Sequence, residues 1–201
     1  DKEAKELTGK EVRIINFLGR EGHTSPFRHA ILSFELYAPL MVCRQLFKYV
    51  VGSDHSYTLD AWNESSRRYI TEKTTFYIPN ENEWRSIPEN KKQGSGEVIS
   101  TDLGGKWSNI LEQTCLEGER NYEAALKDNV CPEQARLFLP AYGLYVRWRW
   151  TASLQSVCHF INQRIAKDAQ KEIADYAQVI KKITTELYPN ATGALLNVDS
   201  D

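Results

Sequence analysis

The sequence lacks a hydrophobic run long enough to cross a membrane. Its longest apolar stretch, residues 30–43, is interrupted by Glu35 and is shorter than the roughly 20 residues that a membrane-spanning helix needs. The first six residues, DKEAKE, contain no apolar core of a signal peptide, and the chain does not begin with Met. We therefore expect no membrane segment and no secretory signal, and we expect a further N-terminal piece before residue 1.

Cysteine and histidine are scarce and scattered. The four cysteines stand at positions 43, 115, 131 and 158, with no C-x-x-C pair, which argues against a disulfide framework or a structural zinc site. The four histidines, at positions 23, 29, 55 and 159, have no metal-ligand spacing either. These absences predict a chain without a metal, in a reducing, cytoplasmic compartment.

An excess of charge of one sign is also missing. Lys and Arg number 25 against 27 Asp and Glu, a net charge of −2, so the chain lacks the electrostatic footprint of a dedicated duplex-DNA binder. A local basic patch is the remaining alternative, and we expect no nucleic-acid partner. With 201 residues, 41% of them hydrophobic, the chain can bury one sizeable core, and we predict a single domain over residues 1–201.

Common catalytic motifs are absent as well. The chain has no G-x-G-x-x-G after a strand, no Walker loop, no H-E-x-x-H and no G-x-S-x-G. Dinucleotide binding by a Rossmann motif, P-loop nucleotide hydrolysis, zinc proteolysis and serine hydrolysis of the α/β-hydrolase type are therefore not expected.

Hydrophobic periodicity predicts a mixture of helices and strands. Helical spacing is expected over residues 12–18 (with a stop at Gly22), 39–47, 107–126, 132–139, 154–161 and 173–187, the last two bent near Arg164 and closing at Pro189. Strands are expected at 32–38, 74–78 and 144–150, a loop at 51–62 and an exposed excursion at 80–105. Strands and helices alternate without a βαβ rhythm, which predicts the α+β class.

One polar cluster suggests chemistry. The segment N-E-S-S-R-R-Y, residues 63–69, offers hydroxyls, guanidinium groups, an amide and a carboxylate within seven positions. Arginine forks bind phosphate oxygens in bidentate fashion, and serine hydroxyls complete such a site. Arg136, beside an apolar run, is either an ordinary residue of a helix surface or a second phosphate anchor. The same two interpretations apply to Arg164. The alternative is a solvated polar connector.

Five segments in one order carry a resemblance. They are G-H-T-S-P-F-R-H at 22–29, Arg44-Gln45, N-E-S-S-R-R-Y at 63–69, A-R-L-F-L-P at 135–140, and Arg164 followed by A-Q-K-E at 169–172. The chain thereby resembles the flavin-dependent thymidylate synthases along nearly its whole length. Their signature is R-H-R-x-x-S-x-N-E-x-S-x-R-Y, and its second half is intact here.

The first half of the signature departs from the family. Lys48-Tyr49-Val50 stands where the family has R-H-R, and Ala61 stands where it has its first serine. Twelve residues, 51–62, separate Val50 from Asn63, where the signature leaves four. His55, inside this insertion, is a candidate substitute for the missing imidazole. The family's opening strand has no counterpart before Asp1.

The resemblance implies a fold, a reaction and a set of partners. It implies a mixed antiparallel sheet flanked by helices, and a homotetramer with shared active sites. The reaction implied is reductive methylation of dUMP to dTMP, with methylenetetrahydrofolate as carbon donor and with FAD, recharged by NADPH, as reductant. The family does not rely on a cysteine nucleophile, and the signature segment here contains no cysteine.

The resemblance also assigns residues, position by position. It implies substrate contacts for Gln45, Lys48, Glu64, Ser66, Arg67, Arg68, Arg136 and Arg164. It implies flavin contacts for Ser25, Lys48, Tyr49, Val50, Glu64, Ser153, Gln155 and His159, and we add His55. Arg164 and His23 are the catalytic candidates: Arg164 matches the arginine that faces the pyrimidine, and His23 lies in the G-H turn near the flavin ring.

Two other classes of function remain open from the sequence. One is a related flavin enzyme that acts on another pyrimidine nucleotide, such as dCMP. The other is a catalytically silent protein that keeps the fold and binds a nucleotide or nucleic acid. Bound flavin, seen as a yellow colour in the purified protein, argues against the second class.

Overall fold

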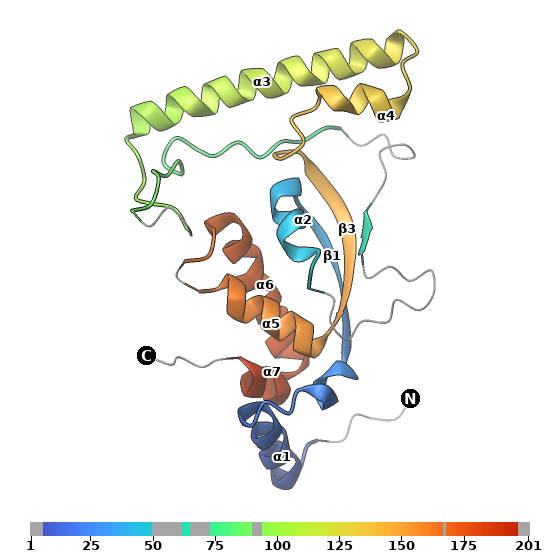
Figure 1. Cartoon of the computed structure of the whole chain (residues 1–201), viewed down its shortest axis with the longest axis vertical. Helices are drawn as coiled ribbons and strands as arrows, with labels where there is room; N and C mark the ends of the chain where they lie inside the picture. Colours follow the sequence, from blue (N-terminus) through green and yellow to red (C-terminus); the bar gives the residue numbers. More distant parts are fainter. Residues whose placement is uncertain (1–5, 50–61, 65–72, 90–93, 167, 197–201) are drawn as a thin grey trace. The chain divides into compact units, whose positions relative to one another are not determined.

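A computed structural model describes residues 6–49, 62–64, 73–89, 94–166 and 168–196, with only the backbone described at 62–64. Its elements confirm the α+β class. The helices and 3₁₀ helices are α1 (Gly9–Arg20), η1 (Ser25–Arg28), α2 (Leu40–Leu46), α3 (Thr101–Lys127), α4 (Pro132–Ala135), η2 (Arg136–Phe138), α5 (Leu154–Arg164), α6 (Lys171–Leu187) and α7 (Pro189–Leu195) (Figure 1). The strands are β1 (Ile31–Pro39), β2 (Trp62–Glu64) and β3 (Tyr145–Ser153). Within these described ranges, no helix is both long and apolar enough to span a membrane.

The three strands form one sheet in the order β1-β3-β2. Strand β2 pairs antiparallel with β3, with Glu64 opposite Trp148. Side-chain contacts between β1 and β3 also run in opposite directions: Thr151 donates to Ser33 (3.0 Å), while Arg147 donates to Glu35 (2.9 Å). The expected antiparallel sheet is confirmed.

Alternation along the strands decides which face of the sheet is buried. Every second residue of β1 from Leu32 onward is buried, as is every second residue of β3 from Val146 onward. The intervening residues are polar or aromatic and more exposed, as expected of an antiparallel sheet with one buried face. On this more exposed face Glu35 pairs with Arg147 at 2.9 Å and with Arg149 at 3.7 Å.

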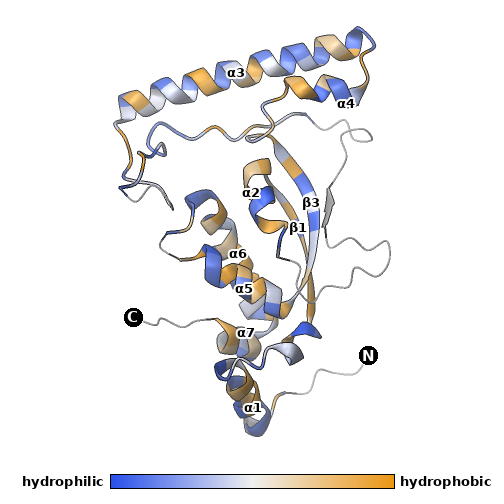
Figure 2. Cartoon of the chain, viewed as in Figure 1, coloured by the Kyte–Doolittle hydropathy of each residue, from blue (hydrophilic) through white to orange (hydrophobic). Residues whose placement is uncertain are grey.

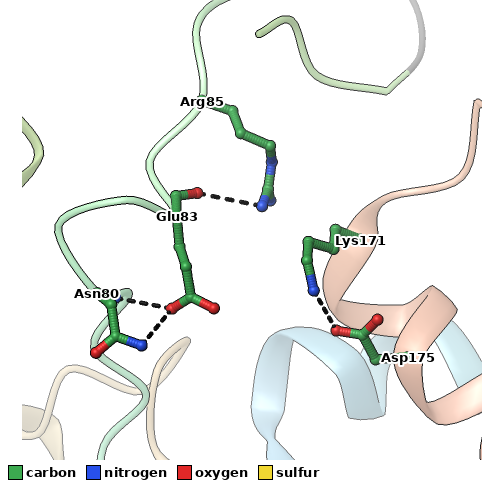
Figure 3. A network of polar contacts seen from close by, with 5 residues as sticks. All are labelled: Asn80, Glu83, Arg85, Lys171 and Asp175. Atoms are coloured by element: carbon green, nitrogen blue, oxygen red, sulfur yellow. Dashed lines mark hydrogen bonds and ion pairs between the residues drawn. The ribbon is translucent and has the colours of Figure 1, made fainter. Parts of the chain in front are cut away.

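Contacts divide the chain into two compact units, each built from separate stretches of sequence. Unit 1 comprises Asp1–Phe34, Lys48–Ala61 and Thr151–Asp201, and unit 2 comprises Glu35–Phe47 and Trp62–Trp150. In unit 1, α5 and α6 pack on each other and α1 packs on α7 (Figure 1). The α1–α7 contact is close, because Gly19 has no room for a side chain against Ala194. On the exposed side of α6, Lys171 and Asp175 form an ion pair at 2.6 Å, one helical turn apart (Figure 3).

Unit 2 is dominated by the 27-residue helix α3, on which hydrophobic and hydrophilic residues mix along the whole length (Figure 2). Gly104 packs against the backbone of Glu81 and Gly118 against Phe138, positions where a side chain would collide. The Ser108 hydroxyl links the helix to the preceding segment, donating to the Pro79 carbonyl (2.6 Å) and accepting from the Trp84 indole (2.9 Å).

The segment before α3 corrects two expectations. Residues 74–78 form no strand: Phe76 makes one isolated bridge, to Leu144. The segment expected as an exposed excursion, residues 80–105, makes internal hydrogen bonds and a β-bridge within the residues that the structure describes. Glu83 accepts from the backbone and side-chain nitrogens of Asn80 (2.8 and 2.9 Å; Figure 3), and Arg85 bridges to Val98. Helix α3 already begins at Thr101.

At the C-terminal end, Pro189 starts a helix where the sequence predicts a stop. It occupies the first turn of α7, where its missing N–H costs no hydrogen bond. The bend expected near Arg164 is a break between α5 and α6. The predicted loop at 51–62 lies, except for Trp62, outside the described residues.

Candidate functional site

Helix α5 carries a polar stripe that borders a cavity. Gln155, His159 and Gln163 follow one another at intervals of four residues, so they share one face of the helix. The cavity has a volume of about 500 Å³, within the range of small-molecule and cofactor sites. Its lining residues are Lys48, Tyr49, Gln155, Ser156, His159 and Gln163. Four of these six, Lys48, Tyr49, Gln155 and His159, are residues that the sequence predicts to contact flavin.

A capping residue and a buried apolar face set the position of the polar stripe on α5. Ser153 ends β3 and caps α5: it is fully buried, and its hydroxyl accepts the backbone N–H of Ser156 at 3.2 Å. On the opposite face of α5, Leu154, Val157 and Ile161 are buried in the core. The helix is therefore amphipathic, and the apolar face anchors the polar one at the cavity.

Gln155 has a defined orientation. The Arg28 Nε donates to its Oε1 at 2.6 Å, across 127 positions of sequence. Because an arginine can only donate, the oxygen of the Gln155 amide must face Arg28, and the two N–H donors of the amide remain for other acceptors. Arg28 is the last residue of η1, which begins at Ser25.

Tyr49 forms the aromatic wall of the cavity. Its ring is 6% exposed and packs edge-on against Phe160, with a centroid distance of 5.2 Å. The His159 ring lies 5.8 Å away, and the Arg164 guanidinium carbon stands 5.8 Å from the Tyr49 centroid. Arg164 also has a buried Nε that finds no hydrogen-bond partner among the described residues.

The charge of the site is positive. Lys48 lines the cavity, its Nζ 5.7 Å from the Tyr49 ring, and no carboxylate is among the described lining residues. A cation and two side-chain amides suit an anionic ligand with hydrogen-bonding edges, such as a phosphorylated cofactor. An imide edge and flat ring such as those of a flavin also fit an aromatic wall flanked by amides.

Two other predicted residues belong to unit 2. Gln45, on the last turn of α2, donates to the Met41 carbonyl at 3.5 Å. Arg136 begins η2 directly after the fully buried Ala135, and its buried Nε has no hydrogen-bond partner among the described residues. A half-buried arginine with an unsatisfied nitrogen is a candidate anion-binding group.

The remaining predicted residues are not gathered at the cavity. His23 and Ser25 are not among the described residues that line the cavity. The His23 ring packs edge-on against Phe17 instead, with a centroid distance of 6.2 Å. Glu64 is described only through its backbone in β2. The predictions for Val50, His55, Ser66, Arg67 and Arg68 fall on positions outside the described residues.

Sequence reasoning missed three residues at this cavity. Gln163 and Ser156 line it, and Arg28 orients Gln155. The spacing of Gln155, His159 and Gln163 on a predicted helix could have revealed Gln163. Nothing in the local sequence joins Arg28 to Gln155, because only the fold brings them together.

A metal centre finds no support in the described ranges, where no three His, Cys, Asp or Glu residues cluster closely enough to hold an ion. Three of the four cysteines are unsuited to act as nucleophiles, and the fourth, Cys131, is exposed and is not among the described residues that line the cavity. Cys43, Cys115 and Cys158 are buried, and burial raises the pKa of the Cys158 thiol to about 12. That thiol therefore stays protonated near neutral pH.

Comparison with known proteins gives consistent results. The family model described as thymidylate synthase complementing protein matches residues 1–190. A flavin-dependent thymidylate synthase of Thermosipho africanus is 32% identical over 180 residues, which cover 90% of this chain and 74% of that protein. One of Thermotoga neapolitana is 33% identical over 180 residues, with 90% and 73% covered.

A solved structure shows the same fold. The UMP/dUMP methylase PolB from Streptomyces cacaoi, bound with 5-Br dUMP, superposes with a TM-score of 0.77 at 24% sequence identity. The match covers 96% of this chain and 81% of that one.

Proposed function

Since the chain belongs to the thymidylate synthase complementing family, and is a flavin-dependent thymidylate synthase that uses FAD for a methyl transfer, we propose that it methylates dUMP to dTMP beside the cavity bordered by α5. The observation that carries the placement of the site is the cavity itself. It brings together four residues that the family resemblance assigns to flavin, although Lys48 and Tyr49 differ in identity from the family signature.

FAD, when bound, supplies the hydride for the reductive methylation. This chain's residues would hold it: the Gln155 amide donates to polar ring atoms, Tyr49 offers an apolar wall, and Lys48 attracts phosphate. The remaining predicted flavin residues, Ser25, Val50, His55, Glu64, Ser153 and His159, complete this proposal. Ser153 contributes through its cap of α5, because its buried hydroxyl is engaged by the Ser156 N–H.

The nucleotide would be held by positively charged side chains. Arg68 and Arg136 are proposed as phosphate anchors, and the buried, unsatisfied Nε of Arg136 supports its part. Arg164 is proposed to face the pyrimidine. A fixed guanidinium there stabilises negative charge on the ring as C5 becomes nucleophilic, a form of electrostatic preorganisation. Further nucleotide contacts are proposed for Gln45, Lys48, Glu64, Ser66 and Arg67.

A cysteine nucleophile is not part of this proposal. Cys158, the one cysteine on α5, is 1% exposed and keeps its proton near neutral pH. His23, in the G-H turn, is proposed to act near the flavin ring. NADPH as the reductant of FAD, methylenetetrahydrofolate as the carbon donor, and a homotetramer with shared active sites are proposed with the reaction.

The test is anaerobic mixing of FAD-loaded protein with NADPH, followed through the flavin absorption band. We expect reduction of the flavin, and formation of dTMP once dUMP and methylenetetrahydrofolate are added. Turnover of dCMP but not dUMP would identify a related enzyme with another substrate. Protein that neither binds flavin nor reacts would refute the proposal in favour of a silent homologue.

A further inference from the structure

Tyr49 stands at the centre of an unusual set of contacts. Its buried ring meets Phe160 edge-on at 5.2 Å and His159 at 5.8 Å. Two cations lie by the same ring, the Lys48 Nζ at 5.7 Å and the Arg164 guanidinium carbon at 5.8 Å. Among the described residues, the Arg164 side chain has no hydrogen bond and no ion pair that would compete with its contact to the ring. Its Nε is buried.

Such a contact between a guanidinium group and a ring restrains the position of the Arg164 charge. A guanidinium within about 6 Å of an aromatic centroid is attracted by the ring quadrupole, and more strongly where water is excluded. Phe160 fixes the ring in turn, because edge-to-face packing in a core restrains orientation. Arg164 is the last residue of α5.

We infer that Tyr49 is a positioning residue that holds the Arg164 guanidinium through its ring face. This rests on the proposed function, in which Arg164 faces the pyrimidine. Tyr49 replaces the imidazole of the family signature with a phenol ring. The orientation of Arg164 in this chain therefore depends on the aromatic ring of Tyr49 rather than on its hydroxyl.

Three substitutions separate the ring from its polar groups. Tyr49→Phe keeps the ring, Tyr49→Leu removes it, and Tyr49→His restores the residue of the family signature. We expect Tyr49→Leu to weaken dUMP binding to the FAD-loaded protein roughly 5- to 30-fold by calorimetry, and Tyr49→Phe to retain most of the affinity. Tyr49→Phe is therefore the matched control, because it keeps the aromatic ring beside Arg164 and removes only the hydroxyl.

The Tyr49→His variant adds a readout that packing alone does not move. Its imidazole becomes a cation below pH about 6.5 and would then repel Arg164. The affinity for dUMP should fall more steeply from pH 7.5 to pH 5.5 in this variant than in the parent. Lys48, His159 and Arg164 face the ring in both proteins, so the readout is the difference between the two pH profiles and not the slope of either one.

A double-mutant cycle tests the contact without any ligand. In urea unfolding of the ligand-free chain, Tyr49→Leu should lower the midpoint less when Met replaces Arg164 than when Arg164 is present. Equal losses in both backgrounds would overturn the inference, as would a loss of dUMP affinity in Tyr49→Phe equal to that in Tyr49→Leu. Failure of the parent to bind dUMP would instead refute the proposed function, and the cycle would then decide alone whether Tyr49 holds Arg164.

Discussion

Because Gln155 accepts a hydrogen bond from Arg28 and lines the cavity, one substitution at Gln155 should change the free energy of unfolding and the affinity for FAD in opposite directions. Arg28 fixes the Gln155 oxygen at 2.6 Å, which leaves the amide N–H donors at the cavity. In Gln155→Glu, a carboxylate of nearly the same shape replaces the amide. The contact with Arg28 becomes an ion pair, while the donors at the cavity disappear.

The two effects have different magnitudes. A solvent-accessible ion pair in good geometry contributes about 0.2–1 kcal/mol, so the free energy of unfolding without FAD should stay level or rise slightly. Loss of the donor leaves an acceptor of the flavin unpaired and places a negative charge beside it, which costs about 1–3 kcal/mol. We therefore expect FAD to bind roughly 5- to 150-fold more weakly.

The assay is a titration of protein with FAD, followed by flavin fluorescence, alongside urea unfolding of the FAD-free protein. Gln155→Met is the matched control: it lacks both the donor and the new charge, and should lose less affinity than Gln155→Glu. If Gln155→Glu bound FAD as tightly as the parent, Gln155 would not donate to the flavin. If both stability and affinity fell, the variant would have disturbed α5 instead.

Three further outcomes are expected. Arg136→Ala should weaken dUMP binding by about 1.5–3 kcal/mol in calorimetry, the range of a hydrogen bond to a charged group; the exposed Arg120→Ala is its control, and equal affinities would remove Arg136 from the phosphate site. Burial raises the pKa of Cys158 from 9.0 to about 12, so from pH 9 towards pH 12 the unfolded chain loses a proton that the folded chain keeps. The free energy of unfolding should then fall by about 1.4 kcal/mol per pH unit from this group, and Cys158→Ala should show a shallower fall in urea unfolding; identical slopes would contradict the assignment. Gly104→Ala should cost about 1–3 kcal/mol in thermal or urea unfolding, because its methyl group would collide with the Glu81 carbonyl, whereas the neighbouring Gly105→Ala meets only ordinary contacts at 3.7 Å and should be neutral or stabilising. Similar stabilities for the two alanine variants would show that the helix does not pack on Glu81 in this way.

Regular periodicity makes much of the fold predictable. Strand β3 is evident from its alternation, because buried and more exposed residues take turns along an antiparallel strand. Helices α1, α5 and α6 follow from apolar residues at helical spacing. Strand β3 and helices α5 and α6 bury one face each, and a buried face leaves a repeat in the sequence.

Elements that depend on distant partners are predicted poorly. Residues 74–78 have strand composition, yet they make a single isolated bridge, between Phe76 and Leu144, since strand formation requires a neighbour as well as propensity. Pro189 suggests a stop, although proline is equally suited to the first turn of a helix.

The candidate site shows the same division. Gln155 and His159 are found through the family resemblance, and the cavity brings them together with Tyr49. The Arg28–Gln155 bond joins residues 127 positions apart, and the contact of Arg164 with the Tyr49 ring depends on a helix and a distant loop meeting. No local pattern encodes such contacts.

The discontinuity of the two units has a consequence for how the protein is made. Unit 1 draws on residues 1–34, 48–61 and 151–201, and unit 2 consists of the two stretches between them, 35–47 and 62–150. During synthesis, α1 leaves the ribosome well before its partner α7 has been translated, so the early segment must wait with its apolar face uncovered. Pairings so far apart in sequence also fold slowly. Nascent chains that end before residue 151 should therefore contain a protease-sensitive N-terminal segment, and protection should arrive only with the last helices.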